Sequence, residues 1–264
     1  MNRTGFIAAP QASGVRTCTI QRRLPRLWDS EACLRLGGNR CYLKKWTTVE
    51  TATTADGKTL SLDEHDGTYM IRLDGAILMS TRQYASEEKL AELACAHLGD
   101  IPAARVLIGG LGFGFTLRAA LATVASDAAV IVAEIVPAVV AWNRNPAFPL
   151  AADAMADPRV TVLTQDVADV IRDEPDGFDS IILDVDNGPV GLSGDVNNRL
   201  YSSTGVKRVR RALRSEGCVA YWSAAPDPVF QKLMVDAGLD VDVHRCRSHV
   251  NSGRWHTLYL GRVQ

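Results

Sequence analysis

The pattern of apolar and polar positions changes along the chain. Residues 46–52 and 58–63 alternate as strands do around a turn at Ala55-Asp56-Gly57. The segments TYMIRL and AILMS then flank Asp74-Gly75, a preferred hairpin turn. These segments predict a small N-terminal β-unit over residues 46–82. A helix is expected next over SEEKLAELACAHLG, which has acidic residues in its first turn and Gly99 at its end.

From residue 104 onward, short apolar runs alternate with helical periodicity. Strands are expected at 104–109, 129–134, 159–163, 178–184, 217–223, 239–246 and 255–261. Helices are expected at 114–125, 136–145, 167–173, 201–214 and 226–237. This alternation predicts an α/β fold with a doubly wound, mostly parallel seven-stranded sheet. The last two strands follow each other without a helix, so they are expected to form an antiparallel edge pair. The Rossmann-like domain is expected to span 83–264.

The first 45 residues differ from the rest in charge. They carry nine Lys and Arg against two acidic residues, a net charge of +7, which leaves −8 for the remainder. They lack sustained periodicity, so we expect a basic, poorly ordered extension over 1–45. The acidic body makes nucleic acid an unfavoured partner and suits a cationic substrate or a sulfonium cofactor.

Composition narrows the class of protein further. No apolar run has the length of about 18–20 residues that a membrane span needs, so no membrane association is expected. The six cysteines form no Cys-x-x-Cys pair and are interpreted as thiols in a reducing cytoplasm. The five histidines lack metal-ligand spacing, and no metal is expected.

The most informative motif is VLIGGLGFGFT, an apolar run that turns into a helix through closely spaced glycines. Gly109, Gly110, Gly112 and Gly114 would let the backbone approach a ligand and direct the free N–H groups of the helix toward it. The spacing is Gly-x-Gly-x-Gly rather than the dinucleotide pattern Gly-x-Gly-x-x-Gly. That form is usual in α/β folds that bind S-adenosylmethionine, although a turn without a ligand remains the alternative.

A second apolar run ends on Glu134, twenty positions after Gly114. A carboxylate there can accept hydrogen bonds from the two hydroxyls of a ribose. Together with the glycine turn, it predicts an adenosine-containing cofactor. A solvated strand end is the competing interpretation of Glu134 alone.

Further polar residues follow the later strands, at the edge where open parallel sheets bind ligands. Asp166 could take the adenine amino group or cap the next helix, and Asp186-Asn187 could contribute to the site or form only a turn. Asp184 ends the fourth strand of the large sheet, and Trp222 lies at the end of the fifth. Trp222 could form a wall of the substrate pocket or fill the core.

With these motifs in view, residues 46–262 resemble the spermidine synthase family of polyamine aminopropyltransferases, which have the class I methyltransferase fold. The resemblance rests on IRLDG, GGLGFG, AEIVPAVV, DPRVTVLTQD, IILDVDNGP followed by LYS, and NSG. It implies decarboxylated S-adenosylmethionine, or S-adenosylmethionine itself, as co-substrate. It also suggests a homodimer, because relatives often dimerise through the region that the β-unit occupies.

The resemblance assigns roles to individual residues. Glu134 would hold the ribose, Asp166 with Val167 the adenine, and Asp184 would be the catalytic acid or base. Asp186 is a second catalytic candidate, and Asn187 and Trp222 are candidates for the substrate pocket.

The acceptor side departs from the family. Gly112 replaces an aspartate of the glycine loop, and Glu87 and Glu88 replace a tyrosine and a histidine. Further departures are Leu78, Trp222 and Val250. The leading hypothesis is therefore a transferase that alkylates a small-molecule amine of unknown identity. A small-molecule methyltransferase and a non-catalytic nucleoside-binding protein stay open as alternatives.

Overall fold

The computed structural model describes residues 45–54, 56–99, 101–185, 199–250 and 252–264. These residues belong to one compact unit. The expected extension over 1–45, apart from Lys45, and the candidates Asp186 and Asn187 lie outside the described residues. Among the described helices, none is both long enough and apolar enough for a bilayer crossing.

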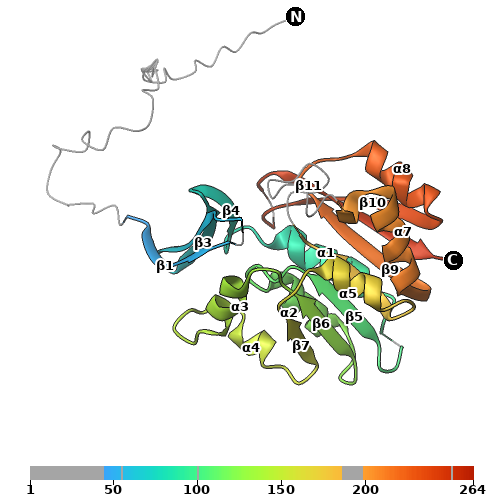
Figure 1. Cartoon of the computed structure of the whole chain (residues 1–264), viewed down its shortest axis with the longest axis horizontal. Coiled ribbons are helices and arrows are strands. Elements are labelled where there is room, and N and C mark those ends of the chain that lie inside the picture. The colour runs from blue at the N-terminus through green and yellow to red at the C-terminus, as the bar shows by residue number, and fades with distance from the viewer. Residues whose placement is uncertain (1–44, 55, 100, 186–198, 251) are drawn as a thin grey trace, which may run out of the picture. The chain divides into compact units, whose positions relative to one another are not determined.

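The N-terminal β-unit is an antiparallel sheet of four strands in the order β1-β2-β3-β4 (Figure 1). Its strands are β1 (Thr47–Thr53), β2 (Thr59–His65), β3 (Thr68–Leu73) and β4 (Ala76–Ser80). Asp74 and Gly75 both have positive φ, 48° and 82°, as a primed hairpin turn requires. Helix α1 (Ala85–Cys95) follows β4, close to the predicted position.

The large sheet has seven strands in the order β10-β11-β9-β8-β5-β6-β7. It comprises β5 (Arg105–Gly109), β6 (Ala129–Ala133), β7 (Val160–Leu163), β8 (Phe178–Leu183), β9 (Leu213–Ser223), β10 (Leu239–Arg247) and β11 (Trp255–Val263). All pairings among β5 to β9 are parallel, whereas β11 runs antiparallel to both of its neighbours. The predicted fold class is confirmed. The chain order reverses beside β5, which is where such sheets bind ligands.

Helices cover both faces of this sheet. Apolar residues of α1, α2 (Phe115–Thr123) and α3 (Pro137–Arg144) pack in one hydrophobic core together with β2 and β3. Residues of α5 (Val167–Asp173), α7 (Ser203–Ala212) and α8 (Pro228–Asp236) form a second core on the opposite face. Strand β8 lies between the two cores and is buried throughout, so a continuous apolar run is the pattern expected for it.

Two expectations need correction. Strand β9 begins at Leu213 rather than 217, directly after α7, because Gly217 and the positive φ of Glu216 let the chain extend through a bulge beside β8. A short helix, α4 (Ala152–Met155), was not predicted. Four residues are too few to show helical periodicity in a sequence.

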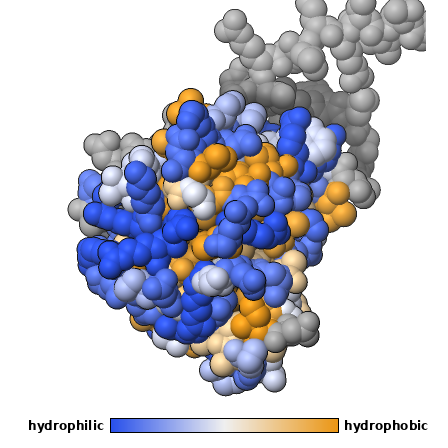
Figure 2. Space-filling model, turned by 90° about the vertical axis from the view of Figure 1, so that its right-hand side faces the viewer, coloured by the Kyte–Doolittle hydropathy of each residue, from blue (hydrophilic) through white to orange (hydrophobic). Residues whose placement is uncertain are grey.

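The surface in Figure 2 is largely hydrophilic with apolar patches between the charged side chains. Large apolar residues with high exposure in the described chain include Ile135, Val229 and Val250. Such scattered exposure is ordinary for a globular protein.

Candidate functional site

The glycine turn connects β5 to α2 at the carboxyl edge of the large sheet. Gly110 has a φ of +88°, and a Cβ built there would lie 2.5 Å from the carbonyl oxygen of Asp184. No side chain can occupy that space, so a glycine is required for the turn to pack against the end of β8. Gly112 has a φ of +51°, and a Cβ on it would lie 3.1 Å from Met79 Sδ.

Glu134 follows β6 and is buried, with 7% of its surface exposed. Its Oε2 accepts a hydrogen bond from the backbone N–H of Leu111 at 2.9 Å, and Oε1 accepts one from Val136 at 2.8 Å. Burial raises the pKa of Glu134, and these backbone donors oppose the rise. Glu134 therefore lies beside the glycine turn, as predicted, and is fixed there by the backbone of the turn.

Asp166 caps helix α5. Its Oδ1 accepts a hydrogen bond from Ala168 N–H at 2.8 Å, and Arg199 donates to its Oδ2. Val167 is buried, and its methyl groups lie within 3.1 Å of a Cβ built on Gly109. The helix-cap interpretation of Asp166 is thus present in the structure, and its predicted contact with adenine stays a prediction.

Asp184 follows β8 and lies opposite the first turn of α2. Thr116 Oγ1 donates a hydrogen bond to Asp184 Oδ2 at 2.9 Å, which orients the carboxylate. Burial raises the pKa of Asp184 to about 6, and the Thr116 hydrogen bond works against the rise. A carboxyl group with such a pKa is largely ionised at neutral pH and can still accept a proton.

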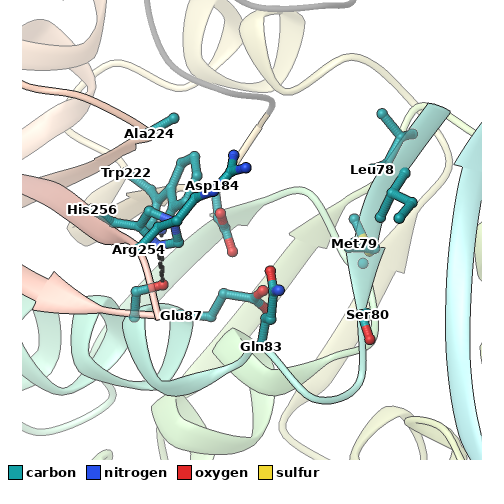
Figure 3. A pocket seen from close by; sticks show the side chains of 13 residues that line it. Leu78, Met79, Ser80, Gln83, Glu87, Asp184, Trp222, Ala224, Arg254 and His256 are labelled. Carbon is teal, nitrogen blue, oxygen red and sulfur yellow. Dashed lines mark hydrogen bonds between the residues drawn. The ribbon is translucent and has the colours of Figure 1, made fainter. Parts of the chain in front are cut away.

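A cavity of about 530 Å³ opens at this edge of the sheet (Figure 3). Asp184, Gly112 and Trp222 line it, so the structure brings three of the predicted residues together. Glu134 and Asp166 lie outside its lining. The opposite wall comes from β4, where Leu78 and Met79 face the cavity. The N-terminal sheet therefore contributes one side of the site.

Glu87, in the first turn of α1, also lines the cavity. Burial raises its pKa well above the ordinary value, and the neighbouring charges of Asp184 and Glu88 raise it further. Within the described chain, the Glu87 carboxylate has no hydrogen-bond or ion-pair partner. The sequence marked this position only as a departure from the family and did not identify it as a site residue.

A partly buried hydrogen-bonded group of Ser86, Trp222 and His256 forms the third wall. Trp222 Nε1 donates to Ser86 Oγ at 3.1 Å, and the same hydroxyl bonds His256 Nδ1 at 2.9 Å. The Trp222 and His256 rings meet edge to face, with centroids 4.5 Å apart. Burial lowers the pKa of His256, and the nearby Arg254 lowers it further. Sequence reasoning left Ser86 and His256 out, because neither belongs to a recognisable motif.

The described residues contain no group of three or more His, Cys, Asp or Glu side chains placed to hold a metal ion. The charged or titratable side chains of the cavity lining are instead two carboxyl groups, a histidine and a guanidinium. Together, the strand order, the glycine turn and this cavity define an α/β protein with a Rossmann-like methyltransferase fold.

Within that class, the fold is similar to the folds of three spermidine synthase structures. It is similar to spermidine synthase from Thermotoga maritima, with a TM-score of 0.64 and 19% identity over 82% of this chain and 73% of the other. A spermidine synthase in complex with the transition-state analogue AdoDATO gives a TM-score of 0.64 and 18% identity, over 82% and 72%. A probable spermidine synthase from Corynebacterium glutamicum ATCC 13032 gives 0.57 and 16%, over 83% and 80%. No protein-family model and no curated protein matches the sequence.

Proposed function

We propose that this protein is a transferase that alkylates a small-molecule amine with an S-adenosyl sulfonium compound, by aminopropyl transfer from decarboxylated S-adenosylmethionine. The observation that carries the proposal is Asp184, a carboxylate oriented by Thr116 at the end of β8 and facing a 530 Å³ cavity. Similarity of fold to spermidine synthases, one of them bound to AdoDATO, supports the same class of reaction.

The residues around the glycine turn fit the nucleoside. Gly112 has no side chain where it lines the cavity, and Glu134 is held beside it by Leu111 N–H. Each carboxylate oxygen retains a lone pair after one hydrogen bond, so Glu134 can still accept from ribose hydroxyls. Asp166 and Val167 are our candidates for the adenine. The co-substrate supplies an electrophilic carbon next to a positively charged sulfur.

In this reaction the protein would accept a proton from the amine and interact favourably with the positive charges of the reactants. An amine must lose a proton to become a nucleophile, and Asp184 is placed to accept it. A new C–N bond then forms while the C–S bond breaks. The electron pair of the C–S bond stays on sulfur, which becomes neutral. Two ionisable carboxyl groups, Asp184 and Glu87, favour the cationic reactants before that step. Trp222 adds an aromatic face that suits a cation.

Methyl transfer from S-adenosylmethionine is the second candidate, and Gly112 favours it. Without a carboxylate at this position, the cavity lacks one negative charge that would repel the carboxylate that S-adenosylmethionine retains. The two reactions differ in their product. Aminopropyl transfer releases methylthioadenosine, and methyl transfer releases S-adenosylhomocysteine.

The test combines binding with turnover. Melting temperature is measured with S-adenosylmethionine, its decarboxylated form and methylthioadenosine, and the nucleoside product is then identified by mass spectrometry with a mixture of amines. We expect a rise in melting temperature and release of methylthioadenosine. A shift without any product would favour the non-catalytic nucleoside-binding alternative, and the absence of any shift would contradict the proposed function. Release of S-adenosylhomocysteine would favour the methyltransferase alternative.

Asp184→Asn tests the catalytic assignment. Loss of a general base is expected to reduce kcat by about 10²–10⁴ while the nucleoside still binds. Asp242→Asn is the matched control, because Asp242 pairs with Arg262 at 3.0 Å on β10, outside the cavity lining. Full turnover by Asp184→Asn would contradict the assignment.

A further inference from the structure

The cavity has acidic side chains in one part and basic side chains in another. This distribution of charge affects which amine can bind. Glu87 and Asp184 present carboxylates to it, whereas Arg254 and His256 line it from the beginning of β11 and the loop before it (Figure 3). Leu78 and Met79 of β4 contribute apolar groups to the opposite wall, beside the polar Ser80 and Gln83. A site for a simple diamine needs only negative and apolar groups.

The acidic part of the cavity, formed by Glu87 and Asp184, has no cationic partner in the described chain. Glu87 has no side-chain partner in the described chain, and Asp184 has only the Thr116 hydroxyl. Two neighbouring carboxylates in a partly desolvated cavity repel each other, and an ammonium group between them relieves that repulsion. This part of the cavity is suited to the amine that reacts.

The opposite part offers donors. The Arg254 side chain is exposed and has no ion pair or side-chain hydrogen bond with any residue that the structure describes. A guanidinium presents a planar fork of N–H groups that matches a carboxylate. Within the part of the chain that the structure describes, Arg254 is thus an unpaired cationic group at a cavity whose other charged residues, Glu87 and Asp184, are acidic.

His256 adds a second donor, as its hydrogen bonds indicate. Trp222 Nε1–H can only donate, so Ser86 Oγ accepts from it. In the tautomer in which His256 Nδ1 accepts from the Ser86 hydroxyl, the neutral ring carries its proton on Nε2, which has no partner among the described residues.

We propose that the acceptor is an amino acid: its amine is held by Glu87 and Asp184, and its carboxylate by Arg254 and His256. The cavity volume of about 530 Å³ falls within the range usual for small-molecule sites, and Leu78 and Met79 would contact the carbon chain between the charged groups. This inference rests on the proposed function, because it names the class of acceptor for the same reaction.

The experiment compares molecules that differ only by a carboxylate. Ornithine and lysine are titrated against putrescine and cadaverine, by calorimetry at neutral pH with saturating methylthioadenosine. In at least one pair the amino acid is expected to bind about tenfold or more tightly than its diamine. Diamines that bind as well as both amino acids would overturn the proposal.

Two variants test whether Arg254 causes the preference for an amino acid over its diamine. Arg254→Gln is expected to remove the preference for the amino acid, leaving the Kd for the diamine unchanged. Arg247→Gln is the control, because Arg247 belongs to the same hairpin but stacks on Trp255 at 4.3 Å and does not line the cavity. Retention of the preference in Arg254→Gln contradicts our assignment.

Binding of methylthioadenosine distinguishes a failure of the acceptor proposal from a failure of the proposed function. If methylthioadenosine binds and no member of either pair does, the acceptor proposal is wrong and the nucleoside site stands. If methylthioadenosine itself does not bind, the proposed function fails and the acceptor proposal fails with it.

Discussion

The two carboxylate pairs at the edge of the large sheet differ in how they are partnered. Glu134 and Asp166 each accept at least one hydrogen bond from backbone N–H groups, and Asp166 also pairs with Arg199. Glu87 and Asp184 face a cavity, and the one side-chain hydrogen bond that the described chain makes to either comes from Thr116. The hydrogen bonds of the first pair stabilise the folded protein. Burial and mutual repulsion of the second pair lower its stability.

This difference teaches where to look for recognition of a variable substrate. A partnered carboxylate stabilises the loop that carries it, so its position is fixed before any ligand arrives. An unpartnered, partly desolvated carboxylate raises the free energy of the folded protein until a cation approaches it. Substitutions in the two regions should therefore change the stability of the protein in different ways.

The glycine turn should be the least tolerant part of the partnered region. Gly110→Ala places a Cβ 2.5 Å from the Asp184 carbonyl oxygen, whereas Gly57→Ala, at a similar φ of +83°, meets nothing within 4 Å. Both variants have the same backbone strain, so the difference between them isolates the clash. We expect Gly110→Ala to lower the free energy of unfolding by about 3 kcal/mol more than Gly57→Ala, measured by urea denaturation.

Asp184→Asn should stabilise the protein while it impairs turnover. The carboxyl pKa is about 6 in the folded state and 3.8 ordinarily, so ionisation costs stability as pH rises from about 4 to 6, and the full cost persists above that. The variant should gain about 3 kcal/mol at pH 8 and less than about 1 kcal/mol at pH 4, by denaturation at both values. An equal effect at both pH values would contradict the assigned pKa.

The matched pair Glu134→Gln and Glu87→Gln should shift stability in opposite directions. In Glu134→Gln, one of the two backbone N–H groups loses its acceptor, which costs about 1–2 kcal/mol. In Glu87→Gln, the repulsion from Asp184 disappears, and stability above neutral pH rises by about 1 kcal/mol. Melting temperatures at pH 8 check both. Glu92→Gln is the control, because Glu92 forms an exposed pair with Lys89.

Much of the fold could be predicted from the sequence because strong local patterns coincide with it. The buried run FDSIIL, the Asp74-Gly75 turn and the glycine turn each have one dominant structural solution, and the structure has it. Glu134 was placed beside the glycine turn from its position at a strand end alone. Parallel strands carry such residues to one edge by geometry, so the spacing along the chain suffices.

The acceptor side could not be predicted in this way. Glu87 and His256 are separated by more than half of the chain and line one cavity only because α1 packs against β9 and β11. A polar residue in the first turn of a helix is ordinary in sequence, and a histidine near the start of a strand carries no motif. Their meaning depends on tertiary packing, which no local pattern reports.

The reversed direction of β11 has an evolutionary consequence. Because this strand enters the sheet from the edge that carries the cavity, the exposed residues of the hairpin end before it can present new side chains there. Replacement of exposed residues of this hairpin, such as Val250 and Arg254, would leave both cores and the glycine turn in place, whereas Ser248 is buried. These exposed positions are therefore open to substitution during evolution while the fold is kept.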